Sequence, residues 1–139
     1  HLFIFCSYRS VFEHDIDQMI VEFHRLRAND ENYSKESTDS YASGAKKSIL
    51  NMNEAKQLEW LKKQCYIALG QLMVGCADMR IDSCPMEGFK SDEVDEVLDL
   101  HSQNLTSVVL LPTGYRSTED KYQHKTKVRK PNNLLFEDK

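Results

Sequence analysis

Asp82-Ser83-Cys84-Pro85-Met86-Glu87-Gly88-Phe89 is a turn sequence that joins a long apolar segment to a short acidic one. Pro85 has no backbone N–H and fixes its own φ, whereas Gly88 can adopt backbone angles that other residues avoid. We therefore expect the backbone amides of Met86 and Glu87 to face outward, available to a ligand rather than to a sheet. Such a turn suits a flat, electron-rich ligand that needs close backbone approach. An ordinary corner between a helix, a strand and a second helix is the alternative that this octapeptide alone leaves open.

The apolar segment before this turn predicts a long helix at the centre of the fold. Asn53 is placed to cap the N-terminus of that helix. From Cys65 to Met79 only Gln71 and Asp78 are plainly polar, and a helix that is apolar on all sides is normally buried on all sides. We expect this helix to be the hub of the fold and part of a subunit interface.

Local sequence patterns predict four further elements. They are a buried strand over the continuous apolar run 2–6, an amphipathic helix over 11–27, a short acidic helix over 92–98 capped by Ser91, and a β-branched strand over 107–111 that continues to 115. His14 and His24 lie on the first of these helices, off the i,i+4 spacing of a metal-ligand pair. We therefore expect both histidines on its solvated surface.

Two stretches lack a regular pattern. Residues 29–47 are rich in Ser, Asp, Asn and Glu, which predicts a mobile polar connection with room for one short helix. Residues 131–139 predict an extended C-terminal tail that carries the apolar group Leu134-Leu135-Phe136.

Length and composition limit the class of protein. The 139 residues form a single domain at most, and the net charge of −4 gives no sign of nucleic-acid binding. The four cysteines show no C-x-x-C spacing and predict buried free thiols in a reducing, cytoplasmic compartment. No apolar run approaches the roughly 20 residues of a membrane span, so we expect no membrane partner.

The residue pattern offers no catalytic side chains of its own. It contains no nucleophile–base arrangement, no metal-ligand cluster and no G-x-G-x-x-G, so a redox enzyme built on this chain would need a cofactor. Residues 115–130 carry six Lys or Arg against two acidic residues. A solvated basic tail is one interpretation of this stretch, and an anion site that includes Lys127 and Arg129 is the other.

From Glu59 to Arg129 the chain resembles the FMN-dependent nitroreductase family. The matching pieces, in the family's order and spacing, are 59–70, 75–79, 81–89, 108–116, 119–122 and 127–131. The resemblance implies an α+β nitroreductase-like fold in which an antiparallel-rich sheet packs against helices. It also implies FMN as cofactor, NAD(P)H as electron donor and a nitroaromatic compound or quinone as acceptor, with ping-pong kinetics.

The resemblance implies roles for particular residues and no obligate catalytic side chain. Its Pro-x-Glu-Gly turn lies against one face of the flavin, with a backbone N–H directed at N5. Here that role falls to Pro85, Met86, Glu87 and Gly88. Lys127 and Arg129 match the family's basic pair at the FMN phosphate. The apolar segment 65–79 and the apolar group 134–136 further predict a homodimer in which each C-terminal tail covers the other subunit.

One part of the family pattern has no counterpart in this sequence. The Arg-x-Ser-x-Arg phosphate motif of the family's N-terminal portion is absent. We therefore expect a single partial domain, truncated at the N-terminus, in which flavin binding depends on Lys127 and Arg129 and is weak. The alternative function is a remnant that dimerises without retaining flavin.

Overall fold

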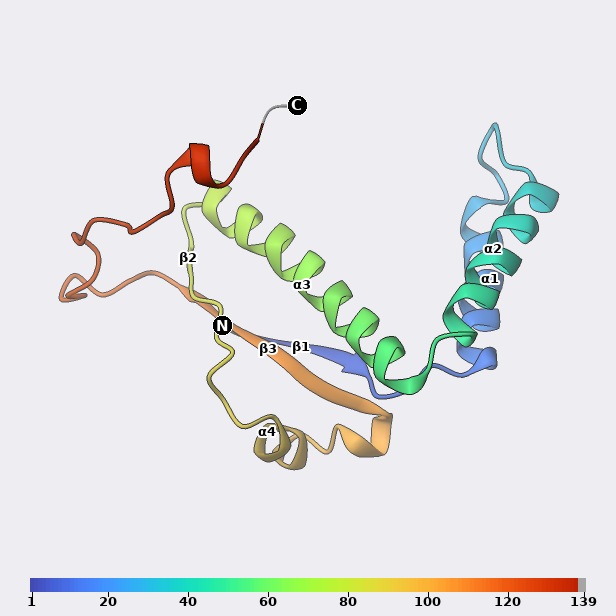
Figure 1. Cartoon of the computed structure of the whole chain (residues 1–139), viewed down its shortest axis with the longest axis horizontal. Helices are drawn as coiled ribbons and strands as arrows, with labels where there is room; N and C mark the ends of the chain where they lie inside the picture. Colours follow the sequence, from blue (N-terminus) through green and yellow to red (C-terminus); the bar gives the residue numbers. More distant parts are fainter. Residues whose placement is uncertain (138–139) are drawn as a thin grey trace.

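β3 (Leu105–Gly114) is the middle strand of a three-stranded antiparallel sheet, between β1 (Leu2–Tyr8) and β2 (Asp82–Ser83) (Figure 1). The computed structural model describes residues 1–137. Its helices are α1 (Glu13–Arg27), α2 (Lys35–Leu50), α3 (Glu54–Asp78) and α4 (Ser91–Val97), with short 3₁₀ turns at His101–Gln103 and Asn132–Leu134. The expected α+β class and the two predicted strands are confirmed. The prediction that the strand over 2–6 is buried is wrong, because β1 is an edge strand and its Leu2 and Phe3 are exposed. Of the four thiols, Cys65 and Cys76 are buried as predicted, whereas Cys84 is exposed.

The core lies where α3 crosses the sheet (Figure 1). Leu69 of α3 packs against Val109 and Leu111 of β3, and both of these strand residues are fully buried. Burying such a side chain contributes roughly 1.5–3 kcal/mol, so these contacts bind helix and sheet together. A bulge between Phe5 and Cys6 shifts the β1–β3 register by one residue.

α3 has the predicted bounds and the predicted cap. The Asn53 side chain accepts a hydrogen bond from the backbone N–H of Lys56 at 3.0 Å. Burial is one-sided, however. Leu61, Cys65, Leu69 and Cys76 are buried, whereas Ile67 is 58% exposed and Val74 is 71% exposed. The prediction that this helix is buried on all sides is wrong within one chain, because the sheet covers only one of its faces.

α1 and α2 form a helical hairpin that extends away from the sheet (Figure 1). The prediction of a mobile connection over 29–47 is wrong for most of that range, which is the regular helix α2. Ser34 caps α2 by accepting from the N–H of Ser37 at 3.2 Å. Small residues of α2 such as Ala42 and Ala45 lie beside the apolar face of α1. Because these side chains are small, the hydrophobic periodicity of α2 is weak although the helix is regular.

His24 joins the two helices of this hairpin. Its Nε2 lies 2.8 Å from Asp39 of α2, and its Nδ1 contacts the Tyr33 hydroxyl. The expectation that His24 lies on a solvated surface is therefore wrong. The sequence pattern predicted α1 but neither the extent of α2 nor the packing of α2 against α1.

The chain after β3 is irregular. A 3₁₀ turn at Asn132–Leu134 replaces part of the extended conformation predicted for the tail. The last two residues of that predicted tail, 138 and 139, lie outside the described residues. Leu134, Leu135 and Phe136 are exposed. Over residues 1–137, no helix is both long enough and apolar enough to cross a bilayer.

Candidate functional site

The turn over 82–89 begins as an edge of the sheet. The N–H of Cys84 donates to the carbonyl of Pro112 at 3.1 Å, and Met86 exchanges two hydrogen bonds with Leu110, at 2.8 and 3.1 Å. The amide of Met86 was expected to face a ligand, and that expectation is wrong. The sheet takes this donor because β3 extends past β2 and presents a free backbone edge.

The next two residues differ from Met86. The carbonyl of Glu87 accepts from the N–H of Phe89 at 2.9 Å, and its carboxylate accepts from the Tyr66 hydroxyl of α3. That hydrogen bond, aided by burial, raises the pKa of Tyr66. The N–H groups of Glu87 and Gly88 have no hydrogen-bond partner among residues 1–137. The turn thus presents two adjacent backbone donors, from Glu87 and Gly88 rather than from Met86 and Glu87.

Open space adjoins Gly88. A Cβ added there would meet no heavy atom within 4 Å, and within residues 1–137 no glycine has a positive φ. The backbone conformation of the turn therefore does not demand glycine at this position. Glycine leaves room instead for another group to approach the backbone closely.

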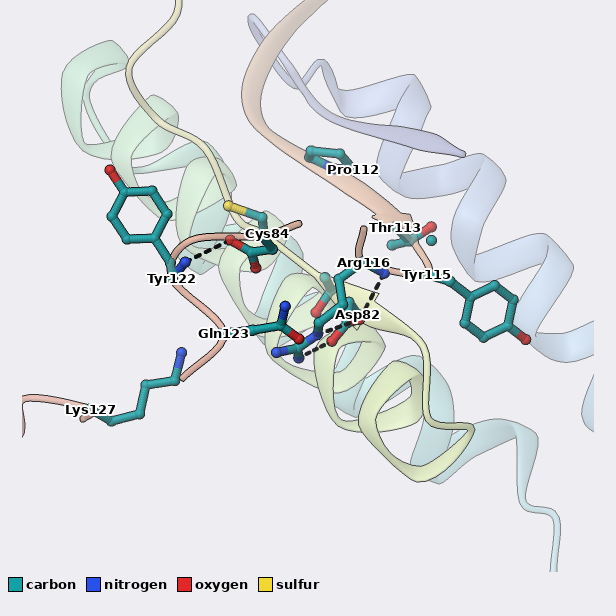
Figure 2. A pocket seen from close by; sticks show the side chains of 12 residues that line it. Asp82, Cys84, Pro112, Thr113, Tyr115, Arg116, Tyr122, Gln123 and Lys127 are labelled. Carbon is teal, nitrogen blue, oxygen red and sulfur yellow. Dashed lines mark hydrogen bonds and ion pairs between the residues drawn. The ribbon is translucent and has the colours of Figure 1, made fainter. Parts of the chain in front are cut away.

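An open groove of about 410 Å³ lies beside the start of the turn (Figure 2). Asp82 of β2 and Arg116, which follows β3, form an ion pair that lines this groove. The backbone N–H and Nε of Arg116 lie 3.1 and 2.8 Å from Asp82 Oδ2, and its terminal nitrogen contacts Oδ1. The hydrogen bonds and charge of Arg116 lower the pKa of Asp82 from 3.8 to about 2. The pair ties the segment after β3 back to β2.

The predicted basic pair is only partly placed beside this groove. Lys127 lines it together with Cys84 and Tyr122 (Figure 2), whereas Arg129 is not among the lining residues and donates to the carbonyl of Val128 at 2.8 Å. Neither cation forms an ion pair within residues 1–137. Pro85 to Gly88 do not line this groove. Within a single chain, the residues of the 85–88 turn and the cations Lys127 and Arg129 therefore do not line a common cavity.

Tyr66 and Arg116 are the residues that sequence reasoning missed. Both fall inside the stretches that resemble the family, yet their partners lie 21 and 34 residues away in the chain. Neither pairing follows a helix or strand period, so no local pattern could have identified it.

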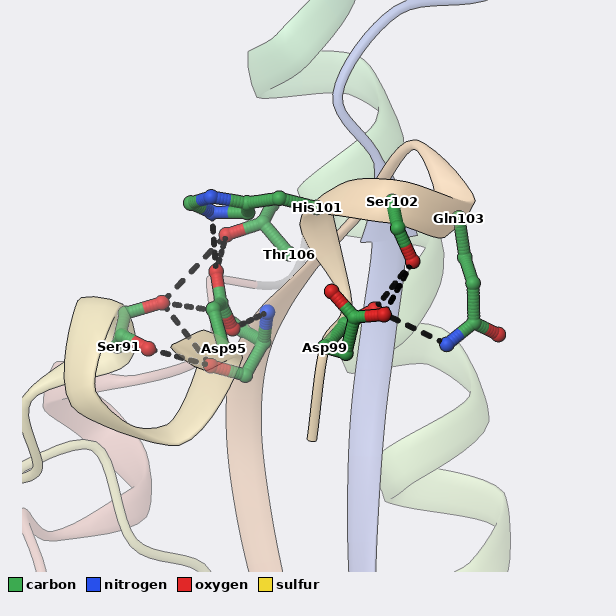
Figure 3. Close-up of polar contacts among 8 residues, drawn as sticks. Ser91, Asp95, Asp99, His101, Ser102, Gln103 and Thr106 are labelled. Carbon is green, nitrogen blue, oxygen red and sulfur yellow. Dashed lines mark hydrogen bonds and ion pairs between the residues drawn. The ribbon is translucent and has the colours of Figure 1, made fainter. Parts of the chain in front are cut away.

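A second polar cluster lies at the other end of β3 (Figure 3). Asp95 of α4 is only 1% exposed and accepts from the Ser107 N–H at 2.7 Å, the Thr106 hydroxyl at 2.6 Å and His101 Nε2 at 3.2 Å. Burial alone would raise the pKa of Asp95, but these hydrogen bonds outweigh it and lower the pKa. The carboxylate is fully bonded, so the cluster fastens α4 to the sheet.

Ser91 belongs to the same cluster. Its hydroxyl donates to the carbonyl of Ser107 at 2.7 Å, and Lys90 occupies the N-cap position of α4. The prediction that Ser91 caps this helix is wrong, because the nearby strand competes for the hydroxyl. Among the described residues there is also no group of three or more His, Cys, Asp or Glu side chains that could hold a metal ion.

Comparisons with known proteins identify related sequences. The model of the nitroreductase family matches residues 12–115. A Staphylococcus haemolyticus protein provisionally named an NAD(P)H nitroreductase is 42% identical over 86 residues, which is 59% of this chain and 38% of that protein. The oxygen-insensitive NAD(P)H nitroreductase of Salmonella typhimurium is 37% identical over 62 residues, which is 45% of this chain and 29% of that enzyme.

The fold also matches solved structures. A provisionally named nitroreductase from Exiguobacterium sibiricum, solved in complex with FMN, superposes with a TM-score of 0.72 at 19% identity. The match covers 91% of this chain and 58% of that one. The nitroreductase-like fold is thereby confirmed, and this chain spans about a third of the length of the curated relatives that it matches.

Proposed function

The chain belongs to the nitroreductase family, and from this membership we propose that it is an FMN-dependent oxidoreductase. The proposed reaction transfers electrons from NAD(P)H to nitroaromatic compounds or quinones. The observation that carries the proposal is the pair of free backbone donors at Glu87 and Gly88, within the matched region and beside open space.

The residues of the turn fit a flavin. Glu87 and Gly88 would donate their N–H groups to it, while Pro85 and Met86 would support its face. An added side chain at Gly88 would occupy the free space beside these donors. When bound, FMN supplies the two-electron redox chemistry, and the protein's contribution is to orient it and to exclude water.

Lys127 and Arg129 would hold the phosphate. Arginine can bind phosphate through two parallel donors and lysine as a point charge. Both side chains are exposed and without an acidic partner within residues 1–137. The irregular segment that carries them lies between β3 and the 3₁₀ turn at Asn132–Leu134, so a bound phosphate could draw Arg129 toward the groove that Lys127 already lines.

A second copy of this chain is the proposed partner. Ile67 and Val74 of α3 and the apolar group at 134–136 are exposed in one chain. Exposed apolar surface of this kind marks an interface, and two-fold symmetry would cover the same surface on both copies. We also propose a reducing, cytoplasmic location, in which the free thiols at Cys6, Cys65, Cys76 and Cys84 would persist.

Reconstitution with FMN tests the proposal. The purified chain is incubated with FMN, separated from free FMN by gel filtration and examined for bound flavin by visible absorbance. NADH or NADPH should then bleach that absorbance, and a nitroaromatic compound or quinone should restore it. A flavin-free dimer after reconstitution would contradict the proposal and support the alternative, a dimerising protein that does not retain flavin.

A further inference from the structure

The 85–88 turn is anchored at three points. Met86 is bound to the sheet through Leu110, and the Glu87 carbonyl is bound locally by Phe89. The third anchor is the Tyr66 hydroxyl, which donates to the Glu87 carboxylate. Within residues 1–137 it is the one side-chain hydrogen bond from α3 to this turn.

These anchors differ in rigidity. Glu87 is exposed, and a free glutamate side chain has several rotamers that cost entropy to fix. Tyr66 projects from the middle of a 25-residue helix whose neighbours Cys65 and Leu69 are buried. A hydroxyl held on a rigid helix therefore restricts the residue that carries one of the two free N–H donors.

The direction of this hydrogen bond also limits the role of Glu87. The phenol donates and the carboxylate accepts, and the bond raises the pKa of Tyr66. One carboxylate oxygen of Glu87 is thus already occupied by a protein donor. The side chain serves as an attachment point, and the backbone N–H remains the group that faces a ligand.

We propose that Tyr66 is a positioning residue that holds the 85–88 turn through Glu87 and keeps the N–H groups of Glu87 and Gly88 aligned for the flavin. That the ligand is a flavin rests on the proposed function. That Tyr66 holds the turn does not depend on any ligand, because the hydrogen bond is within the protein.

Tyr66→Phe removes the hydroxyl and keeps the ring. Tyr8→Phe is the matched control, because Tyr8 is also a half-exposed tyrosine and its hydroxyl has no hydrogen bond within residues 1–137. Amide hydrogen exchange of the flavin-free protein is measured for the segment 84–89 and for a reference segment in α3. Tyr66→Phe should speed exchange several-fold in 84–89 and leave the α3 segment unchanged, and Tyr8→Phe should change neither.

The flavin complex provides the second measurement. Tyr66→Phe should weaken FMN binding several-fold, because flavin binding would then have to order the turn that Tyr66 holds in the wild type. It should also alter the visible absorption of the bound flavin, which responds to the hydrogen bonds the ring receives. Because Tyr66 acts through Glu87, the double variant Tyr66→Phe/Glu87→Ala should bind FMN no more weakly than Glu87→Ala.

The outcomes separate this inference from the proposed function. Unchanged exchange in 84–89, an unchanged flavin spectrum in Tyr66→Phe, or additive losses in the double variant would overturn the role of Tyr66. A wild-type chain that binds no FMN would overturn the proposed function, while the exchange measurement would still decide whether Tyr66 holds the turn.

Discussion

Single residues decide how charge is distributed around the groove. Arg116 is neutralised by Asp82, whereas Lys127 and Arg129 have no acidic partner within residues 1–137. An unpaired cation gains more from an anionic ligand than a paired one, because binding does not first have to break an ion pair. At this scale the two C-terminal cations, and not Arg116, are the expected phosphate contacts.

Replacing both Lys127 and Arg129 with Ala should weaken FMN binding by more than tenfold, since one charged hydrogen bond contributes roughly 1.5–3 kcal/mol. The affinity is measured by flavin fluorescence titration. Lys121→Ala/Lys130→Ala removes the same charge from the same stretch and is the control. Equal losses in the two double variants would indicate a general charge effect, and unchanged affinity would remove both residues from the site.

The pair of Asp82 and Arg116 should make stability depend on pH. The folded-state pKa of about 2 lies below the usual 3.8, so the stabilisation is present above the unfolded pKa and is lost as pH falls through the folded one. Between pH 5 and pH 2 the unfolding free energy of the wild type should fall more steeply than that of Asp82→Asn. Urea unfolding at several pH values measures both, and parallel curves would show that the pair does not stabilise the fold.

At the scale of elements, α3 contacts both the sheet and the 85–88 turn, and its opposite face is exposed. Its N-terminal cap fixes where it begins, its buried face contacts β3, and Tyr66 reaches the turn. A change at the cap therefore tests how far the whole arrangement depends on this one helix.

Asn53→Ala should lower the unfolding free energy by about 0.5–2 kcal/mol, because the N–H of Lys56 loses its acceptor. Urea denaturation measures the change. Asn51→Ala is a suitable control, since the Asn51 side chain makes no hydrogen bond within residues 1–137. Equal effects of the two substitutions would mean that the cap contributes nothing specific.

At the scale of the whole molecule, one chain leaves apolar surface uncovered. The outer face of α3 and the group 134–136 lie on parts of the chain that the sheet does not reach (Figure 1). The proposed dimer would bury both.

Val74→Asp should shift the protein from dimer to monomer or to aggregates, because a buried unpaired charge opposes association. Sedimentation velocity measures the state. Val97→Asp, at an exposed valine of α4, introduces the same charge away from α3 and should leave the dimer intact. A clean dimer of Val74→Asp would place the interface elsewhere.

The sequence by itself determined the elements with strong local patterns and the family. α1 follows from a helical period, α3, β1 and β3 follow from apolar runs, and the cap of α3 follows from Asn53, because these signals act over a few residues. The spacing of the pieces between Glu59 and Arg129 was sufficient to recognise the nitroreductase fold.

Only the tertiary structure decided which groups meet. The sheet took the amide of Met86, the strand took the hydroxyl of Ser91, and α2 became regular by packing against α1. The contact between Tyr66 and Glu87 and that between Asp82 and Arg116 join residues far apart in the chain. The first pair depends on how α3 lies beside the 82–89 segment, and the second depends on the pairing of β2 with β3. Contacts between elements that are distant in the chain leave no periodic trace in the sequence.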